Sequence, residues 1–266
     1  MTRRYRLLPA LLTLGVLSGT ARADDTPEIL TPPSPAAPRI NGPSVFGVRP
    51  GSPFLYTIPA TGARPITYSA EGLPAGLSLE PETGRIIGKI DGIGEHFVVL
   101  IVRNKEGFAV KRFRIVVGNR IALTPPMGWN SWNCWAGAVD QDKVLRSARS
   151  MVATGLINHG WTYVNIDDTW QGQRGGPFNA IQGNEKFPDM KGLCDTIHGM
   201  GLKPGIYSTP WITSYAKFPG GSSDDPKSPW TKALATDKAW RFGKFDMSEN
   251  DAKQYAAWGF DYLKLE

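Results

Sequence analysis

The sequence predicts an all-β sandwich followed by an α/β region that holds about half of a (β/α)8 TIM barrel. Between residues 40 and 118, short β-type runs are separated by Pro, Gly, Asn and Asp at close, fairly regular intervals. From residue 119 onward, strand-like and helix-like segments alternate four times, an order typical of a parallel sheet. Long, aromatic-rich loops follow the strands of this second region, where such barrels hold their binding sites.

The composition is that of a globular protein, with 41% hydrophobic and 20% charged residues. The formal charge of +6 falls to +2, with 26 basic against 24 acidic residues, when the four arginines of residues 1–23 are set aside from the 30 Lys and Arg. No later run is long and apolar enough to be a transmembrane helix. We therefore expect neither nucleic acid nor a membrane as a partner.

Residues 1–23 have the pattern of an export signal. Arg3, Arg4 and Arg6 form a charged leader, and an apolar run at residues 7–17 is too short to span a membrane. Residues 21–23, Ala-Arg-Ala, form a small-x-small cleavage site. The pattern predicts a signal peptide, a mature chain that starts at Asp24, and a secreted or periplasmic location.

Residues 24–39 are rich in proline and predict a stiff, extended linker. Residues 40–118 follow as the predicted sandwich, with β-type runs at residues 54–58, 66–68, 85–88, 96–102 and 113–117. Residues 72–79 (Gly-Leu-Pro-Ala-Gly-Leu-Ser-Leu) and 83–88 (Thr-Gly-Arg-Ile-Ile-Gly) resemble an immunoglobulin-like domain found in many exported bacterial enzymes. The resemblance implies a spacer or accessory module without chemistry of its own.

Capping residues and apolar stripes predict three helices in residues 119–266. Asp140 can cap a helix whose apolar stripe is Val144, Leu145, Ala148, Met151 and Val152. A second helix is expected from Asp189 to about Met200, and a third from Ser248, with Asp251 placed as in a capping box. Strands are expected at residues 162–170, 203–208 and 260–266, after a first segment at 124–133. Residues 171–183 are expected to form a Gly-rich loop, and residues 209–245 a long one.

Two adjacent carboxylates, Asp167 and Asp168, end the strand at residues 162–170. Consecutive strand residues point to opposite faces, so both can serve one site only where the strand gives way to a loop. The carboxyl end of a parallel strand is where α/β proteins place ligand chemistry. The alternative interpretation is that the pair caps the next segment or lies in a solvated turn.

The number of βα units predicts a truncated barrel. A complete barrel has eight units and about 250 residues, whereas residues 119–266 contain about four units. Half a barrel would leave two sheet edges and half a core exposed. We therefore expect residues 119–266 to be the N-terminal half of a barrel, that is, a fragment or a truncated product.

Five sequence blocks carry a resemblance to a known family. They are residues 124–132 (Thr-Pro-Pro-Met-Gly-Trp-Asn-Ser-Trp), 165–170 (Asn-Ile-Asp-Asp-Thr-Trp), 186–190 (Lys-Phe-Pro-Asp-Met), 201–207 (Gly-Leu-Lys-Pro-Gly-Ile-Tyr) and 261–264 (Asp-Tyr-Leu-Lys). Together, and in this order, they resemble the α-galactosidases (melibiases) of glycoside hydrolase family 27. The resemblance implies hydrolysis of terminal α-galactosyl groups in an oligosaccharide or polysaccharide.

The resemblance also implies roles for individual residues. Trp132 lines the sugar pocket, Asp167 and Asp168 accept hydrogen bonds from galactose hydroxyls, and Tyr207 is a pocket residue on the third strand. Lys264 contacts ring hydroxyls near the nucleophile. Carboxylates accept short, strong hydrogen bonds from hydroxyls, and a Lys beside a carboxylate keeps it ionised.

The implied mechanism retains anomeric configuration through a glycosyl-enzyme intermediate and uses two carboxyls about 5 Å apart. Glu266 stands at the nucleophile position, where the family has Asp, and Leu265 stands where an aromatic residue is common. Glu is one methylene longer, and a displacement of about 1 Å can cost about 100-fold in rate. No residue of 1–266 matches the acid/base, so we expect this chain alone to be inactive.

Other functions and features remain open or are disfavoured. One alternative is a catalytically incompetent carbohydrate-binding or structural product. Another keeps the family but changes the sugar, to α-N-acetylgalactosaminidase or β-L-arabinopyranosidase specificity. The three histidines are scattered, so we expect no metal site, and no cofactor is implied. Cys194 has the helical spacing of a buried apolar residue, which makes a disulfide with Cys134 the less favoured reading.

Overall fold

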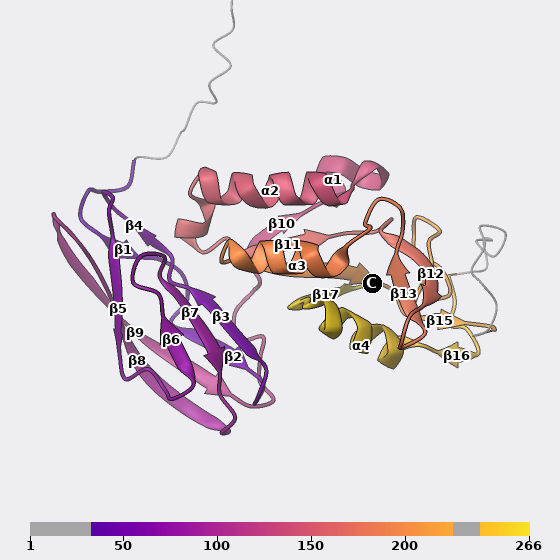
Figure 1. Ribbon diagram of the computed structural model, residues 1–266, viewed down its shortest axis with the longest axis horizontal. Helices are drawn as coiled ribbons and strands as arrows, with labels where there is room; N and C mark the ends of the chain where they lie inside the picture. Colours follow the sequence, from indigo (N-terminus) through magenta and orange to yellow (C-terminus); the bar gives the residue numbers. More distant parts are fainter. Residues whose placement is uncertain (1–32, 226–239) are drawn as a thin grey trace, which may run out of the picture. The chain divides into compact units, whose positions relative to one another are not determined.

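The computed structural model describes residues 33–225 and 240–266 (Figure 1). The predicted signal peptide and most of the predicted linker lie outside the described residues. The end of that linker is bound to the sandwich, because the amide of Ala63 donates to the carbonyl of Ala36 at 2.9 Å. No helix in the described ranges is long and apolar enough to cross a membrane.

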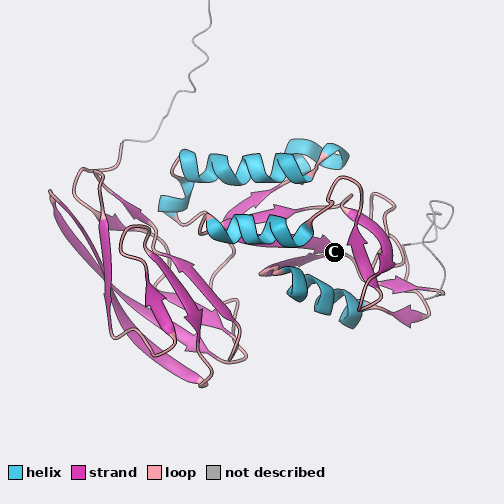
Figure 2. Ribbon diagram, in the orientation of Figure 1, coloured by secondary structure: helices cyan, strands magenta, loops and turns pink. Residues whose placement is uncertain are grey.

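The first region is built from strands and turns (Figure 2) and contains two larger sheets and a two-stranded one. One sheet has the order β2-β9-β8-β5, with bounds Val45–Val48, Gly107–Val117, Gly94–Asn104 and Thr67–Glu71. The other has the order β3-β7-β6, with bounds Pro53–Thr57, Arg85–Lys89 and Leu77–Leu79. Strands β1 (Arg39–Ile40) and β4 (Ala60–Thr61) form a separate antiparallel pair.

The core between these sheets comes from alternate residues of the strands. On β8, Leu100 and Val102 are buried, and on β9, Phe113 and Ile115 are buried, whereas their neighbours in sequence are more exposed. The predicted all-β region is confirmed, and each of its five expected runs overlaps a strand. Strands β2 and β6 were not expected, because β6 has three residues and β2 contains Gly47, and both are weak strand signals.

The second region contains a four-stranded parallel sheet with the order β10-β11-β14-β17. Its strands span Gly128–Asn130, Tyr163–Ile166, Lys203–Ser208 and Tyr262–Leu265. Spatial order therefore follows sequence order, and all four carboxyl ends lie at one edge of the sheet. The predicted alternation of strand and helix is confirmed as a partial α/β arrangement. That this arrangement is half of an eight-unit barrel remains a prediction.

Three longer helices accompany the sheet in Figure 1: α2 (Gln141–Ala153), α3 (Met190–Gly199) and α4 (Ser248–Trp258). Shorter helical turns are α1 (Trp132–Trp135), η1 (Ala136–Ala138) and η2 (Leu156–His159). One core cluster joins the longer helices to the strands; it includes Val144 and Met151 of α2, Leu193 of α3, Tyr255 of α4 and Ile206 of β14. The sheet thus packs one face against helices.

The predicted caps are confirmed at two helices and wrong at the third, although α4 begins at Ser248 as expected. The Asp140 side chain accepts from the amide of Lys143 at 2.8 Å, and Asp189 accepts from the amide of Gly192 at 2.8 Å. At α4 the expected capping box is wrong, because Asp251 is buried and bonds to Arg174 instead. On α2, Val152 is exposed rather than part of the apolar stripe.

The two loops expected from the sequence contain further strands. The Gly-rich stretch folds into an antiparallel hairpin of β12 (Gln171–Gly175) and β13 (Ala180–Gly183). In the long loop, β15 (Ser222–Ser223) pairs with β16 (Phe245–Asp246). These short, Gly- and polar-rich strands have no apolar alternation of their own, so sequence periodicity did not predict them.

Candidate functional site

Asp167 and Asp168 lie immediately after β11, which ends at Ile166. Their exposed fractions are 4% and 2%, so neither is in a solvated turn. The backbone turns sharply at Thr169, whose φ is +82°, a left-handed conformation that is rare for a β-branched residue. Both carboxylates therefore lie where the strand ends and a loop begins. In this position both can face the same site.

Asp167 is held by side chains from two other strands of the sheet, β10 and β17. Its Oδ2 accepts from Asn130 Nδ2 and from Lys264 Nζ, each at 2.8 Å. Asn130 ends β10, and Lys264 lies near the end of β17. Its own amide donates to the Ser131 hydroxyl at 2.9 Å. These bonds place Asp167 where the carboxyl ends of β10, β11 and β17 converge.

Asp168 is held by the turn and by the loop that follows β14. Its Oδ1 accepts from the amide of Thr169 at 2.7 Å and from Gln171 Nε2 at 3.1 Å. Its Oδ2 accepts from the amide of Ala216 at 2.9 Å. Since the amide of Asp168 also donates to Asp167 Oδ1 at 2.8 Å, the two carboxylates form one fixed unit.

Each of these carboxylates retains capacity for a further hydrogen bond. A carboxylate offers about four acceptor positions. Asp167 uses three of them, for Asn130, Lys264 and the amide of Asp168, and Asp168 uses three, for Thr169, Gln171 and Ala216. The remaining positions are suited to hydroxyl donors, because hydrogen bonds from hydroxyls to a carboxylate are short and strong.

Lys264 links this unit to the end of the chain. Its Nζ lies 2.8 Å from Asp167 Oδ2 and 2.9 Å from Glu266 Oε1. Partial burial acts to lower the pKa of Lys264, but the hydrogen bonds to the two carboxylates outweigh it and hold that pKa above its usual value. The ammonium is also 5.5 Å from the centre of the Tyr207 ring. It is thus a fixed positive charge within the cluster.

Tyr207 is buried on β14, with 1% of its surface exposed. Its hydroxyl makes no hydrogen bond of normal geometry to the described residues, although the backbone of Tyr215 lies near it. Burial raises the pKa of Tyr207, and the charges of Asp168 and Glu266 raise it further. A buried hydroxyl without a hydrogen-bond partner lowers the stability of the fold. Such a group is typical of a site where a polar ligand supplies the partner.

The other two predicted site residues are more exposed. Trp132 begins α1, 40% of its surface is accessible, and its amide donates to Asn130 Oδ1 at 2.9 Å. It therefore reaches Asp167 through Asn130. Glu266 is exposed and pairs with Lys264, while its amide donates to the Ser208 carbonyl at 3.2 Å. The structure thus brings together Asp167, Asp168, Tyr207, Lys264 and Glu266, whereas Trp132 connects through its backbone; their roles remain predictions.

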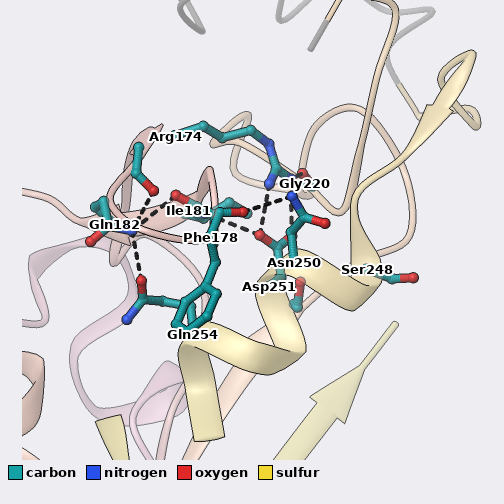
Figure 3. A network of polar contacts seen from close by, with 12 residues as sticks. Arg174, Phe178, Ile181, Gln182, Gly220, Ser248, Asn250, Asp251 and Gln254 are labelled. Atoms are coloured by element: carbon teal, nitrogen blue, oxygen red, sulfur yellow. Dashed lines mark hydrogen bonds and ion pairs between the residues drawn. The ribbon is translucent and has the colours of Figure 1, made fainter. Parts of the chain in front are cut away.

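A second polar network supports the loop that carries Ala216 (Figure 3). Arg174 of β12 makes a two-pronged ion pair with Asp251 of α4, at 2.7 and 2.9 Å, and also donates to the carbonyl of Gly220 at 2.5 Å. Asp251 Oδ1 accepts from the amide of Ile181 at 3.0 Å as well. The network joins the hairpin, α4 and the loop after β14. Both side chains are largely buried, with 11% and 3% exposed.

Sequence reasoning missed several of these groups. Asn130 is the last residue of a strand within one of the five family blocks, so its position at a strand end could have identified it. Gln171 and the backbone of Ala216 have no sequence signal for their contacts. Arg174 and Asp251 are 77 residues apart, and their pairing follows from the tertiary fold alone.

No disulfide or cluster of three metal ligands occurs in the part of the chain that the structure describes. Cys134 is exposed, and Cys194 is buried within α3 together with Met190, Leu193 and Ile197, as the helical spacing predicts. Burial raises the pKa of the Cys194 thiol. That thiol therefore behaves as an apolar core group.

Comparison with known proteins finds matches for both regions. Residues 124–227 match the family described as α-galactosidase A, and residues 37–118 match an Ig domain family. The α-galactosidase of Coffea arabica is 35% identical over 155 residues, which are 58% of this chain and 35% of that protein. The α-galactosidase A of Cellvibrio japonicus is 37% identical over 149 residues, 55% of this chain and 31% of that protein.

Solved structures agree with these matches. A Bacteroides fragilis protein assigned as an α-galactosidase superposes with a TM-score of 0.76 and 35% identity over 90% of this chain and 46% of its own. A second such protein from that organism gives a TM-score of 0.74, with 36% identity over 87% of this chain and 45% of its own. The chain spans about a third of the length of the curated relatives it matches.

The resemblance to the α-galactosidases of glycoside hydrolase family 27 and to an immunoglobulin-like domain is therefore confirmed. The second region is thus similar to glycoside hydrolases of the α-galactosidase family, and the first region is similar to an Ig-like domain.

Proposed function

We propose that residues 119–266 form the galactose-binding half of a retaining α-galactosidase barrel. The observation that supports this most directly is the pair of buried carboxylates, Asp167 and Asp168. Each is oriented by three hydrogen bonds and each has one acceptor position left. The substrate class is an oligosaccharide or polysaccharide with terminal α-linked galactose, a neutral ligand rich in hydroxyl donors.

The two carboxylates would recognise the sugar by accepting hydrogen bonds from its hydroxyls. Their positions are fixed by backbone amides and by side chains of three strands, so they cannot follow a hydroxyl that has moved to the other face of the ring. An epimer would leave an acceptor position of a buried carboxylate unfilled, which a site of this kind rejects strongly. The Tyr207 hydroxyl would supply a further polar contact, and Trp132 an apolar face.

Lys264 would place a positive charge beside Glu266 at the nucleophile position. The 2.9 Å contact between them provides the positive charge that a carboxylate nucleophile needs. Retention requires a second carboxyl about 5 Å away as acid/base. We assign that role to no residue of this chain, and we propose that turnover needs the remaining βα units of a complete barrel.

Galactose binding by the 266-residue chain tests this proposal. Titration calorimetry is expected to show binding of galactose in preference to its C4 epimer, glucose. The variant Asp168→Asn should weaken galactose binding about 10- to 100-fold, because a hydrogen bond to a charged group contributes about 1.5–3 kcal/mol. The matched control Asp195→Asn changes an exposed carboxylate on α3 and should leave the affinity unchanged.

Equal affinity for the two sugars, or equal affinity of Asp168→Asn and the parent chain, would contradict the proposed site. Thermal unfolding of each variant shows whether a loss of binding is a loss of folding, since Asp168 also holds the Ala216 loop.

A second candidate is a chain that binds the sugar and does not hydrolyse it. It is favoured by Glu266, which is exposed and stands where the family has a shorter Asp. Hydrolysis of a chromogenic α-galactoside by the 266-residue chain would exclude this candidate. A substrate panel on a protein with all eight units would separate α-galactosidase from α-N-acetylgalactosaminidase and β-L-arabinopyranosidase activity.

The arginine-rich leader supports export of this enzyme. We expect the exported protein to begin at Asp24, which N-terminal sequencing would check; an uncleaved N-terminus would contradict the expectation.

A further inference from the structure

We propose that Trp211, Tyr215 and Trp240 form an aromatic platform that binds a second pyranose, the sugar to which the galactose is linked. The inference rests on the proposed galactose site. It goes beyond that site by assigning a separate surface to the rest of the substrate.

The three rings form a continuous series. The centres of the Trp211 and Tyr215 rings are 5.2 Å apart with an interplanar angle of 81°, and those of Tyr215 and Trp240 are 5.5 Å apart at 61°. Each ring fixes its neighbour edge to face. Half of the surface of Tyr215 (50%) and Trp240 (49%) remains accessible. The series is therefore a supported surface and not part of the core.

The platform begins beside the proposed galactose site. Tyr215 directly precedes Ala216, whose amide donates to Asp168 Oδ2 at 2.9 Å. The backbone of Tyr215 also lies near the Tyr207 hydroxyl. Lys264 Nζ lies 2.9 Å from Glu266 and 5.5 Å from the centre of the Tyr207 ring, so the proposed nucleophile position is also close to Tyr207. A sugar linked at the anomeric carbon of a galactose bound there would leave the site next to these rings.

Several hydrogen bonds restrain the described residues around the platform. The Trp240 indole donates to the Ser214 carbonyl at 3.1 Å, and the amide of Gly220 donates to the Ile212 carbonyl at 2.8 Å. Arg174, itself paired with Asp251, donates to the carbonyl of Gly220 (Figure 3). A platform held in this way loses little conformational entropy when a ligand binds.

The chemistry of the surface indicates a pyranose. One face of a pyranose ring presents C–H groups, which pack on aromatic faces, while its hydroxyls remain in water. The Trp240 indole N–H is already used within the loop, so this ring would contribute packing rather than hydrogen bonds. Such a surface tolerates different sugars and increases the affinity for any galactoside that has a second ring.

Calorimetry with galactose and melibiose, an α-galactosyl-glucose disaccharide, tests the platform on the full 266-residue chain. We expect melibiose to bind about 5- to 10-fold more tightly than galactose. In Trp240→Ala this ratio should fall to about one, with the galactose affinity unchanged within about twofold. Trp240→Phe retains a ring and should keep most of the ratio, and Tyr215→Ala should lower it.

Trp161→Ala serves as the matched control, because Trp161 is similarly exposed but precedes β11 at the opposite edge of the sheet. It should leave the ratio intact. The inference would be overturned if melibiose bound no more tightly than galactose, or if Trp240→Ala weakened both sugars equally. Galactose binding without this ratio would leave the proposed function standing, whereas no binding of either sugar would overturn both.

Discussion

The sandwich and the α/β region bury different kinds of side chain. Of the fourteen buried polar or charged residues among the described ones, Thr61 alone lies in the sandwich and the other thirteen lie in the α/β region. Burying a polar group costs free energy unless it is hydrogen-bonded. The sandwich therefore gains stability from apolar packing, whereas the α/β region accepts a cost of desolvation, in large part near the edge where its strands end.

This difference predicts opposite responses to mutation. A change in the sandwich core should affect stability and leave sugar binding intact, whereas a change in the polar networks should affect both. All nine Trp lie at position 129 or later, so tryptophan fluorescence follows the α/β region alone.

The largest effect is expected in the sandwich core. Phe113 is fully buried, and its ring centre lies 4.4 Å from that of Tyr56. Phe113→Ala should lower the free energy of unfolding of the sandwich by about 3–5 kcal/mol through loss of apolar burial and creation of a cavity. Hydrogen exchange of the β8 and β9 amides measures this loss. Phe108→Ala, an exposed position on the same strand, should change it by less than about 0.5 kcal/mol.

A loss of galactose affinity in folded Phe113→Ala would contradict the prediction that the sandwich core affects stability and not sugar binding.

A somewhat smaller effect is expected at the buried ion pair of the α/β region. Asp251→Ala leaves Arg174 charged, buried and unpaired, which should cost about 2–4 kcal/mol, less than for a fully buried pair because Arg174 keeps 11% exposure. Urea denaturation followed by tryptophan fluorescence measures the change. Asp195→Ala breaks an exposed pair with Lys191 and should cost about 0.5 kcal/mol or less. Similar losses in the two variants would show that burial does not distinguish the pairs.

The smallest effect is expected at two buried tyrosines, one in each region. The hydroxyls of Tyr56 and Tyr207 have no hydrogen-bond partner of normal geometry in the described part of the chain. Because removing these hydroxyls breaks no hydrogen bond, Tyr56→Phe and Tyr207→Phe should each leave the free energy of unfolding unchanged or raise it by up to about 1 kcal/mol near neutral pH. Only Tyr207→Phe should weaken galactose binding, by about tenfold or less. Equal effects of the two variants on binding would contradict a role for Tyr207 in the site.

The loss of stability at alkaline pH tests the same two tyrosines independently. Burial raises the pKa of both tyrosines, so the folded state keeps their protons at a pH where the unfolded chain has released them. Stability is therefore complete below the unfolded pKa of about 10 and falls as the pH rises above it. Each Phe variant removes one such group and should show a shallower loss between pH 10 and 11 in urea denaturation.

The features of the fold that depend on local sequence patterns could be predicted. The strands β8 and β9 alternate apolar and polar residues, and Asp140 precedes an apolar stripe, so the sandwich and helix α2 follow from periodicity and capping. The adjacent carboxylates at a strand end, together with the family blocks, predict which residues gather at the site. These signals involve residues close together in the chain.

Long-range pairings were not predictable in this way. Asp251 has the spacing of a capping residue, but the buried guanidinium of Arg174 is a stronger partner than a backbone amide, and the hairpin that brings Arg174 there is short and rich in Gly. The contact from the Ala216 amide to Asp168 depends on how the loop after β14 folds. A backbone donor looks the same in every sequence, so no residue type identifies it.

The left-handed backbone at Thr169 gives the site a property beyond its geometry. A β-branched residue in this conformation is strained by about 1–3 kcal/mol and stays there only while its surroundings hold it. The amide of Thr169 donates both to Asp168 Oδ1 and to Gln171 Oε1, so the turn and the carboxylate restrain each other. Loss of either bond removes part of the restraint that holds Thr169 in this strained conformation. The carboxylates should therefore lose their arrangement cooperatively, as one unit, when any member of the turn is removed.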